Sequence, residues 1–159
     1  MGSILPVLLA VVFAGLIAQG MQLAQALPGG SSQSGQSQNA AAAAAVQAEL
    51  YGAACISAAL ASSGTISSSI SVTMPAGVPA PAQALCQTVA DPVAGRDVYS
   101  YTPGVPGEAT SIESDTEGNA SWFRSVAKGQ AASLSGGQTL QIPATIPVGV
   151  MLEVVQVNP

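Results

Sequence analysis

The hydrophobic residues of this chain are concentrated at its beginning. Residues 4–27, ILPVLLAVVFAGLIAQGMQLAQAL, contain no charged side chain. In a helix their apolar positions would lie all around the axis, as in a segment that faces lipid. A helix over residues 2–27 would be about 39 Å long, more than the roughly 30 Å thickness of the hydrocarbon layer of a bilayer. We therefore predict a transmembrane or anchor helix over residues 1–27.

Two other roles remain open for this segment. Ala24-Gln25-Ala26 has the small-x-small form of a leader cleavage site, so the segment could be a signal peptide that is removed. However, no basic residue precedes the apolar run, and the run is longer than the core of a typical leader. An uncharged helix could also pack between copies of the protein instead of in lipid. The missing basic residues and the length favour a retained anchor.

A polar stretch and a predicted helix follow the apolar segment. Residues 28–39, PGGSSQSGQSQN, have the composition of a flexible Gly/Ser/Gln linker. Residues 40–62 are rich in alanine and favour a helix, with Asn39 as its N-cap and Gly64 closing it. The larger apolar residues of this helix define one narrow face: Val46, Leu50, Ala53 and Leu60. The small residues around that face would let the helix lie close against a sheet or another helix.

Short strands are predicted in the remainder of the chain. In ISSSISVTM, residues 66–74, apolar residues alternate with Ser and Thr, which is the pattern of a strand with one buried face. Further strands are predicted at 97–102 and 122–126, with a turn at Lys128-Gly129, and over QTLQI and VGVMLEVVQV near the C-terminus. Helices do not alternate with the strands, which predicts an α+β fold. We expect an N-terminal hydrophobic helix, a linker, and a domain over 40–159 in which one Ala-rich helix packs on a small antiparallel sheet of about five strands.

The charge content excludes several classes of function. Charged residues make up 7% of the chain, the net charge is −5, and Arg96, Arg124 and Lys128 are the only basic residues. Binding to nucleic acid requires clustered Lys and Arg that displace counterions from phosphates, so we expect no nucleic-acid partner. There is no histidine, which removes the usual general base and the commonest zinc ligand.

The two cysteines, Cys55 and Cys86, predict one disulfide if the domain lies beyond the membrane, where conditions are oxidising. Two buried free thiols are the alternative, and they are expected if the domain is cytoplasmic. The pair and the Ser-rich composition favour a domain outside the cytoplasm.

Other candidate sites are weaker. Glu113, Asp115 and Glu117 resemble the first half of a calcium-binding EF-hand loop, but Arg124 stands where the bidentate Glu is required, so we expect a solvated loop there. None of the candidate nucleophiles, such as the many Ser residues, has an assignable general base beside it, so we expect that the protein is not an enzyme. We likewise expect no cofactor, no metal and no small-molecule substrate. The only large aromatic pair, Trp122-Phe123, anchors the core or, as the functional alternative, forms an exposed patch for partner contact.

The C-terminal part resembles a known family in its order of segments: GRDVYSYTP, then SWFRSVAKGQAASL, then LQIPATIPVGVMLEV. This order is similar to that of the small PilM-type proteins encoded with type IVb and conjugative thin pili, which differ from the larger actin-like proteins of the same name. The family plan also matches: a short hydrophobic N-terminal segment, an Ala-rich helix, then a small β-rich domain. The resemblance implies a membrane-associated accessory factor in pilus biogenesis, without catalytic residues.

Pilins and minor pilins are the closest rival class, because a hydrophobic helix, a small sheet and a disulfide describe them too. They usually carry a basic leader ending in Gly and a Glu five residues later; if Gly2 were that residue, Val7 would occupy the Glu position. We therefore expect a non-catalytic component of a type IV pilus or related secretion or conjugation machine. We expect it in the bacterial inner membrane with its C-terminal domain in the periplasm. Its partners would be other machine components or copies of itself; the alternative is a pilin-like subunit in an extracellular pilus.

Overall fold

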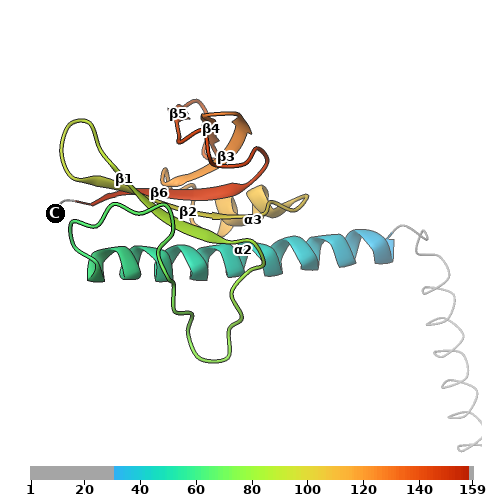
Figure 1. Cartoon of the computed structure of the whole chain (residues 1–159). Coiled ribbons are helices and arrows are strands. Elements are labelled where there is room, and N and C mark those ends of the chain that lie inside the picture. The colour runs from blue at the N-terminus through green and yellow to red at the C-terminus, as the bar shows by residue number, and fades with distance from the viewer. Residues whose placement is uncertain (1–30, 158–159) are drawn as a thin grey trace, which may run out of the picture. The chain divides into compact units, whose positions relative to one another are not determined.

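The computed structural model describes residues 31–157, which form two helices and six strands (Figure 1). The predicted anchor over residues 1–27 lies outside the described residues. From Gln38 onward the described residues form one compact unit. In chain order the elements are α2 (Ser31–Ala61), β1 (Leu85–Ala90), β2 (Arg96–Thr102), α3 (Glu108–Asp115), β3 (Trp122–Ala127), β4 (Gln130–Ser133), β5 (Thr139–Gln141) and β6 (Met151–Val157).

The six strands form one antiparallel sheet with the order β1-β2-β6-β3-β4-β5. The last strand, β6, lies at the centre, between β2 and β3. Its register places Leu152 opposite both Tyr101 and Phe123. The predicted α+β fold is confirmed, with six strands instead of about five.

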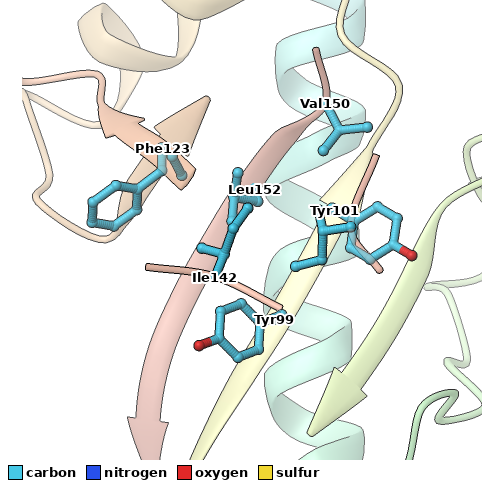
Figure 2. Close-up of a cluster of buried hydrophobic side chains, with 8 residues drawn as sticks. Tyr99, Tyr101, Phe123, Ile142, Val150 and Leu152 are labelled. Carbon is cyan, nitrogen blue, oxygen red and sulfur yellow. The ribbon is translucent and has the colours of Figure 1, made fainter. Parts of the chain in front are cut away.

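Each face of the sheet buries apolar side chains. On one face lies α2, which runs along the sheet in Figure 1. The contacts beneath it form two buried groups: Tyr51, Cys55, Ala59, Cys86, Val98 and Val157; and Ala45, Ala48, Ile112, Trp122 and Met151. On the other face, residues of β2, β3 and β6 meet the connection between β5 and β6, and Figure 2 shows part of this cluster: Tyr99, Tyr101, Phe123, Ile142, Val150 and Leu152. The connection that supplies Ile142 and Val150 therefore covers the face opposite α2.

Helix α2 begins at Ser31, within the stretch predicted to be a linker. The predicted N-cap, Asn39, is an interior residue of the helix. Starting a helix is costly, but each added residue costs little, so a strong Ala-rich segment can extend into neighbouring Ser and Gln residues. At Ser37 the hydroxyl donates to the Ser34 carbonyl (2.9 Å), which is compatible with continued helix.

Residues 66–74, predicted as the clearest strand, do not form one. They make a single isolated bridge between Ser67 and Thr88 of β1, and the Ile70 amide donates to the Cys86 carbonyl (2.7 Å). From Ile70 onward the alternation still sets burial, because Ile70, Val72 and Met74 pack against the cluster beneath α2, whereas Ile66 is 55% exposed. A ladder would need more backbone pairing than this, and the prolines from Pro75 onward prevent its continuation.

The sequence did not predict β1, β4 or α3. Helix α3 includes Glu113 and Asp115 of the acidic stretch that was expected to be a solvated loop. Gly107 precedes the helix, and its φ of 87° favours glycine. The buried Glu108 then accepts a hydrogen bond from the Val105 amide (2.7 Å), and Ile112 is completely buried. At the other end of α3, the Thr116 hydroxyl donates to the Ile112 carbonyl (2.6 Å), so side-chain hydrogen bonds and the burial of Ile112 hold this segment in place.

Candidate functional site

The side of α2 that faces the sheet consists mostly of small residues, with Tyr51 as a large buried side chain among them. Ala45, Ala48 and Ala59 are buried there, and Gly52 lies against the side chains of Glu153 on β6 and Trp122 on β3. A Cβ atom at Gly52 would collide with the carboxylate of Glu153 and would approach the Trp122 ring to 3.7 Å. The small side chains therefore allow the helix backbone to approach the sheet closely, and they fix which side of α2 is turned inward.

A disulfide holds α2 to the edge strand β1. As predicted for an oxidising compartment, Cys55 and Cys86 are bonded, their Cα atoms lie 5.6 Å apart, and both side chains are completely buried. Cys55 is on the helix and Cys86 on the strand, so the covalent bond joins the two layers. It fixes the rotation of the helix about its own axis as well as its position.

A buried arginine closes the C-terminal end of α2. Arg96, the first residue of β2, is 3% exposed. Its guanidinium donates to the carbonyl oxygens of Ala59 (2.6 Å), Ser62 (2.8 Å) and Thr65 (2.8 Å). Carbonyl groups at a helix end lack partners within the helix and carry partial negative charge, so a guanidinium is well suited to bind them.

The outward side of α2 carries the larger apolar residues. Val46 is 48% exposed, Leu50 36% and Leu60 56%. The sequence singled these residues out as the apolar face of the helix, but in the structure they point away from the sheet. We call the exposed set Val46, Leu50, Ala53, Ser57 and Leu60 the outer stripe. It contains no charged side chain, whereas a helix face that meets only water is usually rich in charged and polar residues.

A groove runs beside the C-terminal half of the outer stripe. Its volume is about 490 Å³. One wall is α2 and the other is the segment that follows it, which passes the helix in Figure 1. The lining residues are Leu50, Ala53, Ala54, Ser57, Ala58, Ser71, Thr73 and Pro75. The groove and the outer stripe share Leu50, Ala53 and Ser57, so they form one continuous, largely apolar surface.

Two carboxyl groups lie between α2 and the sheet. Burial raises the pKa of Glu153 to about 7, a weak hydrogen bond from the Ser121 hydroxyl (3.5 Å) opposes this, and the charge of Glu49 adds to it. Burial also raises the pKa of Glu49, and the nearby charge of Asp115 raises it further. One carboxylate oxygen of Glu49 is buried without a hydrogen-bond partner. These acids lie on the inner side of α2, so the outer stripe remains uncharged.

Trp122 and Phe123 are buried in the core, at 3% and 7% exposed. Adjacent residues of a strand point to opposite faces of the sheet. Trp122 therefore packs under α2 and Phe123 in the cluster on the other face. The alternative that this pair forms an exposed patch for partner contact is wrong, because both side chains are buried.

Other hollows and side-chain clusters in the described part of the chain have fewer features of a functional site. A second hollow of about 500 Å³ lies where β2 ends and β6 begins, with Tyr101, Arg124 and Val148 among its lining residues. In residues 31–157, no group of three or more His, Cys, Asp or Glu side chains could hold a metal ion. Helix α2 has the length and composition to cross a membrane, but it packs on the sheet, and core helices of soluble proteins meet the same criterion.

Comparison with known proteins identifies no relative: no family model, characterised protein or solved structure matches the chain. The outer stripe is therefore the surface that the structure itself offers as a site of function. The sequence pattern identified Val46, Leu50, Ala53 and Leu60 as one apolar face, but it did not indicate that this face points away from the sheet. The signal that could have revealed it is the inner side of the helix, where Gly52, Cys55 and a series of alanines repeat with helical spacing.

Proposed function

We propose that this protein is a non-catalytic accessory component of a type IV pilus or a related secretion or conjugation machine. Residues 1–27 anchor it in the bacterial inner membrane, and the domain lies in the periplasm. It acts through contacts with other proteins, and the outer stripe of α2 is the contact surface. The exposed, uncharged outer stripe is the observation that carries this proposal.

The outer stripe leaves apolar surface in contact with water. Val46, Leu50 and Leu60 are 36–56% exposed, and burying apolar surface contributes roughly 25 cal/mol per Å². The disulfide, the small inner residues and Arg96 all hold α2 in one rotation, so the helix cannot turn these side chains inward. Only a partner can cover them.

Two features of the chain support the proposed compartment. The uncharged segment 4–27 has the character of a membrane anchor or a signal sequence, and the disulfide is characteristic of an oxidising compartment. The similarity of the C-terminal segments to the small PilM-type proteins supports a pilus or conjugation machine. The absence of histidine from the sequence supports a role without catalysis.

The proposal can be tested by placing a charge on the outer stripe. Leu50→Asp in the full-length protein, expressed in the native host, is expected to abolish pilus assembly or DNA transfer. The matched control is Val93→Asp, because Val93 is 90% exposed in the connection between β1 and β2. Thermal unfolding and the oxidised state of Cys55–Cys86 should be unchanged in both variants. Normal pili with Leu50→Asp at normal protein levels would contradict the proposal.

A pilin-like subunit is the second candidate, favoured by a specific observation. A long helix follows an uncharged N-terminal segment and packs on an antiparallel sheet, and this order of elements also describes pilins. Shearing the cell surface distinguishes the two roles. An accessory factor stays with the membrane fraction, whereas a pilin-like subunit is recovered in the filaments.

A further inference from the structure

We propose that Asn119 is a glycosylation site, at which an oligosaccharide is attached to the side-chain nitrogen Nδ2 outside the cytoplasm. This inference goes beyond the proposed contact function and shares with it only the location of the domain. Three observations carry it: the sequence around Asn119, the exposure of its side chain, and the turn in which it lies.

The sequence around Asn119 has the pattern of an acceptor site. In Asn119-Ala120-Ser121 an asparagine is followed by a residue other than proline and then by Ser, which is the pattern that asparagine-linked glycosylation requires. The other two asparagines do not fit, because Ala41 stands two residues after Asn39 and Pro159 directly follows Asn158. A pattern of three residues also occurs by chance, so its place in the fold decides its weight.

The structure places this acceptor pattern on the surface. Asn119 lies between the end of α3 at Asp115 and the start of β3 at Trp122, outside both elements. Asn119 and Ala120 are both exposed. A glycan is bulky and hydrophilic, so it needs an acceptor in a surface loop. The folded domain can carry a glycan at Asn119 without any rearrangement of its core.

The backbone turn presents the Asn119 amide. Glu117 and Gly118 both have positive φ, 54° and 74°, so the chain bends sharply directly before Asn119. Oδ1 of Asn119 then accepts a hydrogen bond from the Ser121 amide (3.0 Å), which forms an Asx turn. This hydrogen bond draws electron density toward Oδ1, and the Nδ2 protons become more acidic. The turn therefore favours Nδ2 as the reacting atom.

Two side chains next to Asn119 are available to a transferase. The Ser121 hydroxyl makes only a weak hydrogen bond to the Glu153 carboxylate (3.5 Å), so little is lost when an enzyme binds this hydroxyl instead. Glu117 is exposed and lies two residues before the acceptor, where its carboxylate can pair with a basic residue of the enzyme. Residues 117–121 thus combine an acid, the acceptor and a hydroxyl within one turn.

The reaction needs an activated sugar, and the donor class is an oligosaccharide linked through pyrophosphate to a polyprenyl lipid. Nδ2 of Asn119 forms a bond to the anomeric carbon of the first sugar. The bond between that carbon and the pyrophosphate oxygen breaks, and polyprenyl pyrophosphate leaves with the bonding electrons. Nδ2 gives up one proton to a base of the transferase. Since charged residues make up only 7% of the chain, the attached glycan adds hydrophilic surface to the domain.

Mass spectrometry of the full-length protein from its native host tests the inference. Arg96 and Arg124 are consecutive basic residues, so trypsin releases residues 97–124 as one peptide in which Asn119 is the only asparagine. This peptide contains no cysteine, so the Cys55–Cys86 disulfide does not complicate its mass. The peptide is expected to be heavier by the mass of an oligosaccharide and to release sugar fragments on collisional activation.

Variants assign the added mass to the acceptor pattern. Asn119→Gln and Ser121→Ala are each expected to abolish it, while Ser121→Thr keeps it because threonine supplies the same hydroxyl. Asn39→Gln is the matched control and is expected to remain fully modified. Glu117→Gln is expected to lower the modified fraction, and an unchanged fraction would overturn the role of Glu117 in recognition. A normal melting temperature shows that each variant is folded.

The remaining outcomes separate this inference from the proposed compartment. Added mass that persists in Asn119→Gln would show attachment to Ser or Thr and would overturn the inference. An unmodified peptide from protein with an oxidised Cys55–Cys86 bond would overturn the glycosylation site and leave the compartment standing. An unmodified peptide from protein whose two cysteines are free thiols in the native host would overturn both.

Discussion

The carboxyl group of Glu153 makes stability depend on pH in a way that can be measured. It lies between α2 and β6, against Gly52, and burial raises its pKa from an ordinary value of 4.5 to about 7. In the folded protein the acid is therefore protonated at pH values where it is ionised in the unfolded chain. Between about pH 4.5 and 7 the folded state binds more protons, so this group makes folding less favourable as pH rises.

The magnitude follows from the size of the pKa change. Each pKa unit corresponds to about 1.4 kcal/mol, so a rise from 4.5 to about 7 sets a ceiling of about 3 kcal/mol. Because Glu153 is only partly shielded from water, we expect about 1–3 kcal/mol. The stability that the protonated Glu153 side chain contributes to the folded state is fully present below about pH 4.5 and is lost as pH rises through 7.

The substitution Glu153→Gln removes this titration while keeping the size and the hydrogen-bonding capacity of the side chain. At pH 8 the variant is expected to be more stable than the natural protein by about 1–3 kcal/mol, and near pH 4.5 the two should be similar. The assay is urea unfolding, followed by tryptophan fluorescence, at a series of pH values with the disulfide intact. Burial also raises the pKa of Glu49, Asp97 and Glu108, so the difference between the two profiles is the quantity to compare.

The control is Glu113→Gln, on the exposed side of α3, whose profile should follow that of the natural protein. The reasoning would be refuted if Glu153→Gln and the natural protein differed by less than about 0.5 kcal/mol at pH 8. It would also be refuted if the variant were the less stable one there.

Two further predictions concern the attachment of α2. Arg96→Met removes three hydrogen bonds from a charged group, each worth about 1.5–3 kcal/mol, although relief from burying the guanidinium offsets part of this loss. We expect about 3–5 kcal/mol less stability in urea and faster amide exchange at the end of α2; a loss below about 1 kcal/mol would contradict the capping role. Replacing Cys55 and Cys86 together by Ala should lower stability by about 3–4 kcal/mol. Adding reductant should lower the urea midpoint of the natural protein. If reductant lowered the midpoint of the double variant equally, the loss of stability could not come from breaking the Cys55–Cys86 bond.

Local sequence patterns predicted the elements whose stability comes from their own residues. The alanine-rich composition predicts the helix at residues 40–62, and the apolar runs around Tyr99 and Leu152 predict the strands β2 and β6. The Lys128-Gly129 turn joins β3 and β4, and Gly129 has a positive φ of 77°. These features depend on backbone propensity and short-range alternation, which are properties of the local sequence.

Tertiary contacts decided the elements whose local signals are weak or contradictory. Residues 66–74 alternate like a strand, but β1 bonds to them at only a few atoms, and the chain then passes beside α2. In contrast, β1 has no strong pattern of its own and is held by its pairing with β2 along its whole length. A strand needs a partner for its backbone groups, and the sequence of one segment cannot specify whether that partner is present.

The side of α2 that faces the sheet shows most clearly which features the local sequence determines and which only the tertiary structure decides. The sequence by itself determined that the helix forms, that it is nearly uncharged, and that it has an apolar face at Val46, Leu50 and Leu60. Only the tertiary structure decided that this face is turned outward. The disulfide bonds Cys55 to Cys86 of β1, and this bond holds the side of the helix that also carries Gly52 and Ala59 against the sheet.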